Sequence, residues 1–494
     1  MQPKVEMLDH EFVARILGEA FELLERPGVK VQAPAAAELL SSFGARVERA
    51  ADGAVVHIPE ALARRALATA PHEFFLYDRG GNAAVHYGGN DVHFDPGSSC
   101  VYLLDSATLE HRPAQAADLV RLLQVSEMLP QYAAQSTAMV CADAAAEIGD
   151  LYRLFLVLWY SKKPVVTGGF SAAGGRRMLD LLAIEAGGRQ QMRQKPRAVF
   201  DVCPSPPLTW TEFAGQSLID LARAGVPAEI ISMPLAGAAA PVTLAGAVVQ
   251  HAAECLSGIT IHQLAAPGAP VVWGGAPAIF DMRTGNTPMG AVETAMIDIA
   301  YAQVGKSLGL PTHTYLGGGD AKIVDAQAGL ESGMAAVLGA LAGINMISGA
   351  GMLNFLAAMS LEKLVIDAEA IGYAQRLLAG IEARTSTLAT EMFAALGHSG
   401  DFLKLKETRR LFRSEQYLPS AVIDRDTLRG WQEADSPSAF DRARVRVNEL
   451  LAGYQRPDIP SAVEDGVRSF VEAEARRAGM AEFPGIEPRL VDAV

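Results

Sequence analysis

The sequence has few cysteines and few charged residues, and each shortage excludes a class of protein. Four cysteines, Cys100, Cys141, Cys203 and Cys255, are scattered among 494 residues and form no CxxC pair. This spacing predicts neither a disulfide framework nor a zinc site, and it fits a reducing cytoplasm. Only 20% of the residues are charged and 50% are apolar, so we expect a well-packed globular protein rather than a disordered one.

The sequence also lacks a basic surface and a basic leader. Its net charge of -14 is spread along the chain, which argues against nucleic acid and anionic membrane surfaces as partners. The first residues, MQPKVEMLDHEF, are acidic where a secretory leader would be basic and then apolar. We therefore expect a cytoplasmic protein.

One stretch, residues 332–361, has no charged residue and is long enough to cross a bilayer. Its glycines, together with Asn345, Ser348 and Asn354, divide it into shorter pieces, and no basic cluster flanks it. The interpretation we favour is a buried helix, a strand and a loop, because elements covered on both sides are apolar throughout.

A repeated pattern begins near residue 133, in which a short apolar run is followed by a helix-like segment. Eight such units indicate parallel strands joined by right-handed helical crossovers, which is typical of a (β/α)8 or TIM barrel within the α/β class. A doubly wound open sheet is the alternative, because little room is left for a helix between the last two runs. The runs are AAQSTAMV from Ala133, PVVTGGF from Pro164, AVFDVCPS from Ala198, EIISMPLAG from Glu229, PVVWGGA from Pro270, THTYLGGGD from Thr312, INMISGAG from Ile344 and KLVIDAE from Lys363.

The pattern divides the chain into three regions. Residues 1–132 combine helical segments with short alternating runs and are predicted to form an α+β extension. Residues 133–370 contain the predicted barrel. Residues 371–494 are helical and rich in charge, and we expect them to pack on the barrel or on a partner.

The segment PTHTYLGGGDAKIVDAQAG, residues 311–329, is the strongest candidate for a site. In a barrel the chemistry belongs to the loops after the C-terminal ends of the strands, and three glycines here precede a group of polar residues. Asp320 and Asp325 are the candidate catalytic groups, although acids at this place also cap helices. Other polar or aromatic candidates in such loops are Thr167, Ser205, Trp210, Asp281, Lys322, Asn354 and Asp367.

The predicted substrate-binding residues would suit a cation that carries a carboxylate. Aromatic faces attract a quaternary ammonium, although aromatics near barrel strands also serve as core. Arg283 could hold a carboxylate in a two-pronged geometry, and an ion pair with Asp281 or Glu293 is the alternative. The predicted set is Trp273, Phe280, Arg283, Tyr315, Gln327, Phe355 and Glu369.

No metal site is predicted in this chain. The sequence has no HExxH and no GxSxG motif. His251 and Glu254 lie one turn apart on a predicted helix away from the barrel mouth, where a packing role is favoured over metal binding.

Three long segments contain the blocks DMRTG from Asp281 and DAQAG from Asp325, in that order, and the run AGINMISGAGMLNF from Ala342. Together they resemble the trimethylamine methyltransferase family, whose members are corrinoid-dependent barrel proteins. The resemblance implies a (β/α)8 barrel that transfers a methyl group from an amine to the Co(I) of a separate corrinoid protein.

The sequence departs from the family pattern in two places. Members that act on trimethylamine carry pyrrolysine, whereas every residue here is standard, so the chain resembles the branch that includes glycine betaine methyltransferase. In the tail, FLKLKETRR has Glu407 before Thr408 where relatives show a His-Thr pair. A quaternary ammonium needs no activation, because it already carries the charge that it loses with the methyl group; a betaine is the expected substrate.

The corrinoid is expected to come from a partner protein. DVHFDPG at residues 91–97 approaches a cobalamin-binding DxHxxG motif but has Pro96 at the glycine position, so no cofactor is expected to bind within this chain. Self-association into a homo-oligomer is left open. Two rival interpretations are a lyase or hydrolase that uses Lys322 and Asp325, and a non-catalytic betaine-binding protein.

Overall fold

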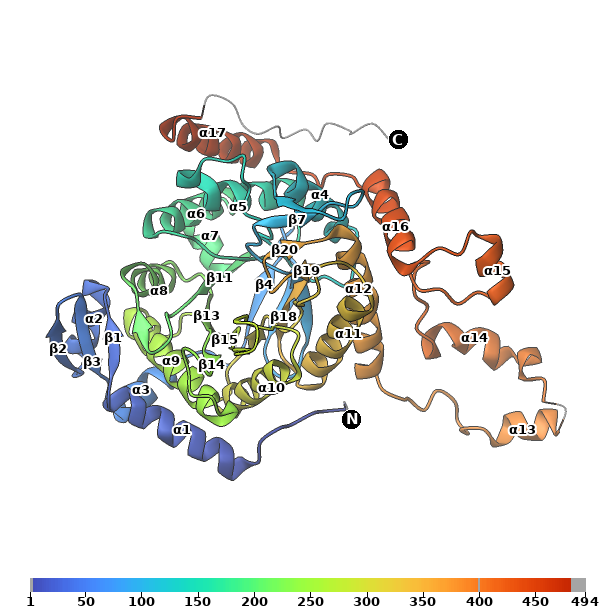
Figure 1. The fold of residues 1–494 in the computed structure, drawn as a ribbon, viewed down its shortest axis with the longest axis horizontal. Coiled ribbons are helices and arrows are strands. Elements are labelled where there is room, and N and C mark those ends of the chain that lie inside the picture. Colours follow the sequence, from blue (N-terminus) through green and yellow to red (C-terminus); the bar gives the residue numbers. More distant parts are fainter. Residues whose placement is uncertain (1–2, 399, 481–494) are drawn as a thin grey trace.

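The computed structural model describes residues 3–398 and 400–480, and its centre is a group of short parallel strands surrounded by helices (Figure 1). Eight strands occupy this centre: β6 (His93–Pro96), β9 (Gln135–Ser136), β10 (Val165–Thr167), β11 (Ala198–Val202), β13 (Ala228–Ser232), β15 (Val271–Gly275), β17 (His313–Thr314) and β18 (Met346–Ala350). Strands β9, β10, β11, β13 and β15 pair in parallel in that order, as do β17, β18 and β6.

Backbone hydrogen bonds join these two groups of strands at both junctions. Trp273 N donates to Pro311 O at 2.9 Å between β15 and the start of β17. Ala133 N donates to Phe94 O at 2.9 Å between the start of β9 and β6. We call the eight strands the strand ring.

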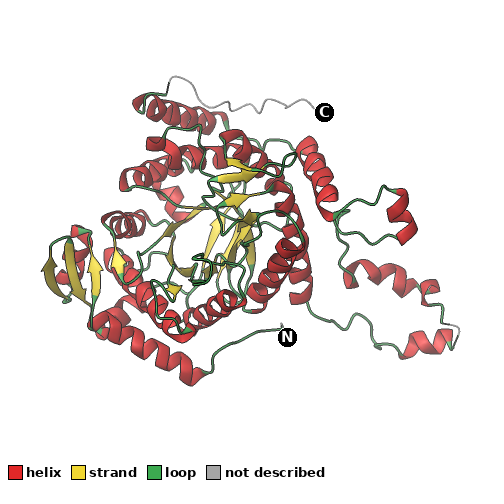
Figure 2. Cartoon of the chain, viewed as in Figure 1, coloured by secondary structure: helices red, strands yellow, loops and turns green. Residues whose placement is uncertain are grey.

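Helices cover the outer side of the strand ring, as the red ribbons around the yellow strands show (Figure 2). Hydroxyl or carboxylate side chains cap several of their N-termini, including Ser171, Thr211, Thr243 and Ser360. The helices are α4 (Ala116–Glu127), α5 (Gly149–Tyr160), α6 (Ala172–Glu185), α7 (Arg189–Gln194), α8 (Glu212–Ala224), α9 (Leu244–Ala265), α10 (Val292–Ser307), α11 (Ala326–Leu341) and α12 (Leu361–Leu378), with a 3-10 turn at Ala146–Ile148.

The N-terminal region adds three helices and a small sheet to the outside of the ring. Helices α1 (His10–Glu25), α2 (Pro34–Ser42) and α3 (Glu60–Leu67) pack against α9. Strands β1 (Val29–Val31), β2 (Arg46–Ala50) and β3 (Gly53–His57) form a sheet that β12 (Thr209–Trp210) extends.

Three small sheets accompany the strand ring. The hairpin β4 (Phe74–Tyr77) and β5 (Ala83–Tyr87) lies behind the ring centre in Figure 1. Strands β14 (Leu235–Ala236) and β16 (Ala278–Ile279) form a second pair. The third sheet has four strands in the order β19 (Met352–Leu353), β20 (Ala358–Met359), β7 (Tyr102–Leu104) and β8 (His111–Pro113).

The C-terminal region is helical, as predicted. Helices α16 (Ala439–Gly453) and α17 (Ser461–Arg477) pack on α12 and α4, and on α6 and α5, respectively. Helices α13 (Thr390–Leu396), α14 (Lys406–Glu415) and α15 (Leu428–Glu433), with a 3-10 turn at Phe402–Lys404, form an arm that stands away from the body (Figure 1).

Seven of the eight predicted strands are confirmed, and the eighth is wrong. The run from Lys363 lies inside α12, because Ser360 caps the helix by accepting from Lys363 N, and Lys363 Nζ pairs with Asp367 one turn later at 2.7 Å. The strand that completes the set is β6, from the segment assigned to the N-terminal extension. The domain boundaries at residues 132 and 370 stay a prediction.

The long apolar stretch is divided as expected. Residues 332–361 contain the end of α11, strand β18 and the pair β19–β20. Within the described residues, one helix, Leu244–Ala265, is long and apolar enough to span a membrane, and 83% of its most apolar window is buried inside the protein. This burial is that of a core helix.

Candidate functional site

The N-terminal end of the strand ring is filled by the β4–β5 hairpin. Phe74, Leu76, Val85 and Tyr87 of the hairpin form one buried cluster with ring residues. Those ring residues, which point inward, are Ala134, Val166, Val199, Val272 and Met346. A ligand therefore has to enter from the opposite end, where the C-terminal ends of parallel strands place their loops.

Three chemically active side chains meet inside the ring, one level above the apolar cluster. Asp201 on β11, Glu229 on β13 and His313 on β17 each point inward, and one ligand atom from each lies within 4.8 Å of the other two. Glu229 and His313 are completely buried. Side chains along a strand point alternately to its two faces. Asp201, for example, lies two positions after Val199, which points into the apolar cluster, and so it points inward too.

Two tyrosines fix the carboxyl groups of this cluster. Tyr315 Oη donates to Asp201 Oδ2 at 2.6 Å, and Tyr87 Oη donates to Glu229 Oε1 at 2.6 Å. The second oxygen of each carboxyl group, Asp201 Oδ1 and Glu229 Oε2, is buried and accepts from no other described side chain, and the two carboxyl groups interact with each other. Two buried carboxyl groups that meet without a further donor are a candidate binding site.

A serine and a third carboxyl group extend the cluster. His313 Nε2 lies 2.8 Å from Ser348 Oγ, and Ser348 Oγ donates to Asp95 Oδ1. Asp95 is on β6, so the network of polar side chains crosses most of the ring. We call Asp95, Asp201, Glu229, His313, Tyr315 and Ser348 the ring cluster.

Burial dominates the electrostatics of the ring cluster. It raises the pKa of Asp201 to about 6 and the pKa of Glu229 and of Asp95 well above the usual range of a carboxyl group. The same desolvation lowers the pKa of His313 to about 3, so its imidazole is neutral. Perturbed pKa values gathered in one place are typical of functional sites.

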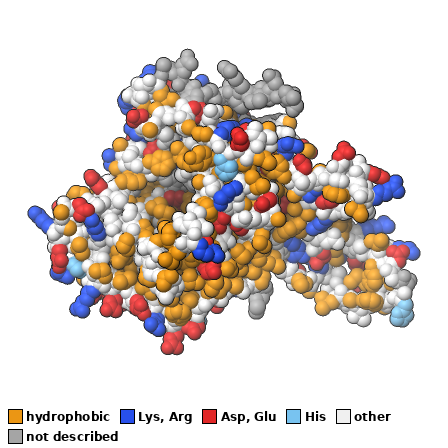
Figure 3. All heavy atoms as spheres, in the orientation of Figure 1, with side chains coloured by type: hydrophobic (Ala, Val, Ile, Leu, Met, Phe, Trp, Pro, Cys, Tyr) orange, Lys and Arg blue, Asp and Glu red, His pale blue; other side chains and the backbone are white. Residues whose placement is uncertain are grey.

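Above the ring cluster, the mouth of the ring is lined by loops after the strands. Arg153 on α5 is buried, donates to Thr137 O at 2.9 Å and lies over the ring of Phe170 at 4.4 Å. Leu356 contacts the apolar group that contains Tyr315, Ile231 and Met289. The space-filling view shows a hollow over the centre of this face (Figure 3).

The loop after β18 is held in an unusual conformation. Asn354, Phe355 and Leu356 have positive φ values of 51°, 57° and 68° in succession. Non-glycine residues adopt this left-handed region at a cost, and such strain clusters at binding sites. Here it directs Leu356 toward Tyr315.

Of the predicted substrate-binding aromatics, Tyr315 faces the ring interior and Trp273 does not. The Trp273 side chain is completely buried between β15 and α10, where Nε1 donates to Tyr301 O at 3.0 Å. A Cβ added to Gly305 would lie 2.6 Å from the indole. The prediction for Trp273 is therefore wrong, since odd-numbered positions of β15 point toward the helices; the core alternative holds.

Arg283 and Phe280 lie in the long loop after β15, outside the ring. The Arg283 side chain is 88% exposed and makes a two-pronged pair with Asp281, at 3.0 Å and 2.7 Å. This ion pair is the alternative foreseen from the sequence. Phe280 is half-buried, and its backbone N donates to Ala236 O at 3.0 Å.

Asp320 and the glycines before it hold loops together. Asp320 accepts from Met289 N at 2.7 Å and from Gly290 N at 3.0 Å, which fixes the loop after β15. Gly317 passes so close to β18 that an added Cβ would meet Ser348 O at 2.8 Å. The glycines are thus needed for backbone approach, and the geometry of Asp320 is that of a structural group.

Asp325 and Gln327 serve helix α11. Asp325 is its N-cap and accepts from Gln327 N at 2.9 Å and Ala328 N at 3.3 Å. Gln327 Nε2 donates to Glu331 Oε1 at 2.7 Å. Phe355 lies under Lys322, whose Nζ is 3.6 Å from the ring centre. The predicted catalytic role of Asp325 is not supported by this capping geometry, and neither is a lyase that uses Lys322 with it.

The remaining candidates have structural contacts. Glu369 accepts from Tyr417 Oη at 2.8 Å and from Ser420 N at 3.1 Å, so it ties α12 to the C-terminal region rather than binding at the mouth. Asp367 accepts from Gly351 N, and Trp210 donates to Ser257 Oγ at 2.8 Å in the core. His251 and Glu254 pack behind the ring, where His251 Nε2 contacts Gly274 O at 2.9 Å.

The DVHFDPG segment contains strand β6. His93 Nε2 accepts from His86 N at 3.2 Å, and Asp95 belongs to the ring cluster. Both side chains are therefore engaged inside the protein.

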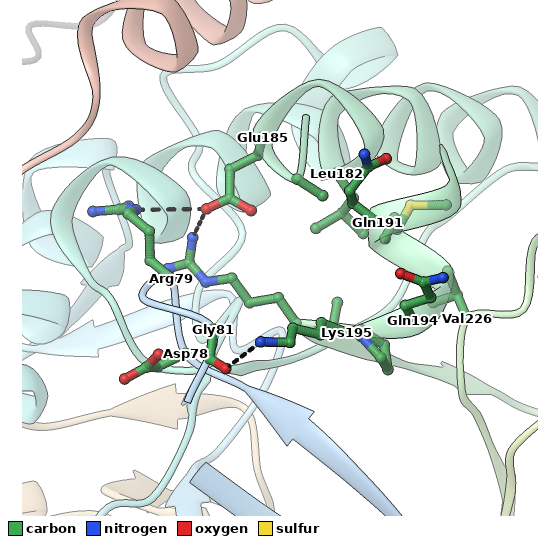
Figure 4. Close-up of a pocket in the computed structure, with 14 residues that line it drawn as sticks. Asp78, Arg79, Gly81, Leu182, Glu185, Gln191, Gln194, Lys195 and Val226 are labelled. Carbon is green, nitrogen blue, oxygen red and sulfur yellow. Dashed lines mark hydrogen bonds and ion pairs between the residues drawn. The ribbon is translucent and has the colours of Figure 1, made fainter. Parts of the chain in front are cut away.

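A separate pocket of about 330 Å³ lies at the other end of the molecule (Figure 4). It opens beside the start of β11, where Arg79 and Arg197 pair with Glu185 and Lys195 Nζ donates to Gly81 O at 2.8 Å. Desolvation lowers the pKa of Arg79 to about 10. This pocket is at the N-terminal ends of the strands, away from the ring cluster.

Sequence reasoning missed Asp201, Glu229 and His313. Each lies alone within an apolar strand segment, in AVFDV, AEIIS and THT, so no two are close in sequence. The signal that could have identified them from the sequence is a charged or imidazole side chain at an inward position of a buried strand.

The fold and site define an α/β protein that places acidic and aromatic groups at the C-terminal ends of parallel strands. The chain belongs to the trimethylamine methyltransferase (MTTB) family, whose model matches residues 1–481. Two curated relatives are trimethylamine methyltransferase MttB of Desulfitobacterium hafniense (30% identical; 96% of this chain, 94% of the relative) and glycine betaine methyltransferase of the same species (28% identical; 97% and 98%).

A third relative supports this assignment, and a solved structure shares the fold. Trimethylamine methyltransferase MttB1 of Methanosarcina mazei is 33% identical over 91% of both chains. The structure of monomethylamine methyltransferase MtmB of Methanosarcina barkeri aligns with a TM-score of 0.51 at 12% identity, covering 92% of this chain and 89% of that one. At this identity the likeness concerns the fold alone.

Proposed function

We propose that this protein is a methyltransferase that moves a methyl group from a quaternary amine, a betaine, to the Co(I) of a separate corrinoid protein. The family assignment supports methyl transfer, since the named relatives are methyltransferases. The observation that supports the choice of substrate is the hydrogen bond from the Tyr315 hydroxyl to Asp201, which holds the aromatic side chain of Tyr315 on the inner side of the strand ring.

The strand ring is, on this proposal, a (β/α)8 barrel with its active site at the mouth. The parallel order of the eight strands and the hydrogen bonds at both junctions support this arrangement. The hairpin packs against the other end of the strand ring and closes it to solvent, which suits a reaction that must exclude water.

A quaternary ammonium suits the groups at the mouth. An aromatic face holds a cation without forming a tight ion pair, so it does not overstabilise a charge that fades in the transition state. Tyr315 offers such a face, and its hydroxyl is fixed by Asp201. The chain needs no acid catalyst for this substrate, because the nitrogen leaves as a neutral amine.

The corrinoid would be supplied by a partner protein that docks over the mouth. Its Co(I) is the nucleophile that takes the methyl group, while the bonding electron pair stays on nitrogen. The protein's own contribution would be to position the N-methyl group in line and to keep water out of the strand ring. A cytoplasmic location follows from this partner and is part of the proposal.

The test is methyl transfer by the purified full chain with a Co(I) corrinoid. Formation of methyl-Co(III), followed by absorbance, is expected with glycine betaine and not with trimethylamine. Activity with trimethylamine alone would refute the proposed substrate. Ligand affinity without any methyl transfer in the presence of a competent corrinoid protein would favour the betaine-binding alternative.

A further inference from the structure

The ring cluster contains buried atoms that its hydrogen bonds leave unused. Asp201 Oδ1 and Glu229 Oε2 accept from no other described side chain, and the two carboxyl groups interact with each other through these oxygens. Glu229 and His313 have no exposed surface. Each unsatisfied buried polar atom costs about 1–3 kcal/mol, so a cluster of them indicates a bound group.

The distances within the cluster suit metal ligands, provided that His313 Nε2 exchanges its 2.8 Å contact with Ser348 Oγ for the ion and the imidazole proton moves to Nδ1, which has no partner among the described residues. His313 Nε2 lies 3.7 Å from Glu229 Oε2, too far for a hydrogen bond. Two ligands of a tetrahedral ion with bonds of about 2.1 Å are separated by about 3.4 Å. The Asp201 carboxylate completes a group within 4.8 Å, so small side-chain rotations bring all three onto one ion.

The surroundings also resemble the outer shell of a metal site. Tyr315 and Tyr87 each donate to one oxygen of a carboxyl group and leave the other oxygen directed into the cluster. Such second contacts orient metal ligands and support their affinity. Two carboxylates would balance the charge of a divalent ion, and the pairing would offset the desolvation free energy of burying these charges.

We propose that Asp201, Glu229 and His313 bind a divalent transition-metal ion of the zinc type inside the strand ring. One imidazole and two carboxylates form a donor set used by such ions, and an open position would face the mouth. In the reaction proposed above, that position takes a carboxylate oxygen of the betaine, while the Tyr315 ring takes the ammonium. This role rests on the proposed function; the binding of the ion does not.

The first test is a Zn²⁺ titration of the metal-free full chain by calorimetry. One ion per chain is expected, with little affinity for Mg²⁺, which prefers oxygen ligands. Asp201→Asn, Glu229→Gln and His313→Gln are each expected to weaken binding by at least about 100-fold. Zn²⁺ binding that is absent in the wild type, or unchanged in all three variants, overturns the proposal.

Two matched controls separate this site from other sources of affinity. Glu254→Gln changes a buried carboxyl group on α9 that accepts from Ser232 Oγ and Leu208 N, and it should leave Zn²⁺ binding unchanged. Cys203→Ser removes a thiol near the mouth and should also have no effect. Loss of Zn²⁺ binding in either control, with the three variants unaffected, would assign the ion elsewhere and refute the site.

A second measurement does not depend on folded variants. Wild-type crystals soaked in a zinc salt should show an anomalous density peak about 2.1 Å from both Glu229 and His313. Density at the surface alone would contradict the proposal.

The proposed role of the ion is tested by comparing two quaternary ammonium compounds, one with a carboxylate and one without. Zn²⁺ should tighten the binding of glycine betaine about tenfold or more and leave that of tetramethylammonium, which has no carboxylate, unchanged. Equal effects on both would refute the carboxylate role even if the ion binds. Methyl transfer in the metal-free chain would refute the same role and leave the proposed function standing.

Discussion

Tyr315, in the loop after β17, donates a hydrogen bond of 2.6 Å to Asp201 on β11, three strands away around the ring. This contact brings together an aromatic side chain and a carboxyl group from distant parts of the sequence on the inner side of the strand ring. It also raises the pKa of the Tyr315 hydroxyl well above its ordinary value, because burial and the neighbouring carboxyl groups disfavour the phenolate. The phenol is therefore a fixed donor.

Tyr315→Ala is expected to weaken binding of glycine betaine by about 2- to 30-fold, since a cation–π contact contributes about 0.5–2 kcal/mol. Tyr315→Phe is the control: it keeps the ring and should bind betaine almost as the wild type does. The Phe variant should nonetheless be less stable by about 1–3 kcal/mol, because Asp201 Oδ2 loses its donor. Calorimetry and urea unfolding measure the two effects, and equal loss of affinity in both variants would contradict the ring's role.

Trp273→Ala is expected to lower the free energy of unfolding by about 3–5 kcal/mol, because it leaves a cavity between β15 and α10. Betaine affinity of the folded variant should stay within about twofold of the wild type. A large loss of affinity with normal stability would restore the cage role that the sequence suggested.

Arg283→Ala should change betaine affinity by less than about twofold. The guanidinium is 88% exposed and already paired with Asp281, and such surface pairs contribute little. The measurement is a direct titration of both proteins. A loss of tenfold or more would mean that Arg283 swings into the mouth when substrate binds.

Asp320→Asn distinguishes a structural from a catalytic carboxylate. The amide oxygen can still accept from Met289 N or Gly290 N, so the rate of methyl transfer should fall by less than about fivefold. Limited proteolysis should show faster cleavage near residues 281–290 in Asp320→Ala, where both contacts are lost. A rate reduced more than about 100-fold in a stable Asn variant would make Asp320 catalytic after all.

His251 should make stability depend on pH. Burial lowers its pKa to about 3 in the folded state, against about 6.5 when unfolded, so the unfolded chain binds more protons between these values. Stability is therefore retained above pH 6.5 and falls as the pH falls toward 3. His251→Gln should reduce this slope by up to about 1.4 kcal/mol per pH unit. Urea unfolding at pH 7, 6 and 5 measures it, and an unchanged slope would argue against a buried neutral imidazole.

Much of the strand pattern was predictable from the sequence, because fully buried parallel strands appear as apolar runs that end in glycine or proline. The failure at Lys363 arises because LVID has strand-like composition, while the Ser360 cap and the Lys363–Asp367 pair favour a helix. Strand β6 was missed because HFDP is short and polar, and its burial is decided by β18, far along the chain.

The candidate site was predicted less well. Tyr315 was among the predicted residues and lies in the ring cluster, where its role in binding stays a prediction. Asp325 and Asp320 were selected because they are close together in sequence, whereas their contacts are those of a helix cap and of a contact between loops. The fold brings the ring cluster together from single residues on or beside β6, β11, β13, β17 and β18. Local sequence patterns do not show that these residues are close in space.

The pairing of β6 with β18 has a consequence for how the chain is made. His93–Pro96 leaves the ribosome about 250 residues before the strand that pairs along one of its edges. The backbone amide and carbonyl groups of that strand edge, and the side chain of Asp95, therefore stay exposed to solvent until Met346–Ala350 has been synthesised. Nascent chains that contain β6 but not yet β18 should thus be the most prone to aggregation and the most dependent on a chaperone.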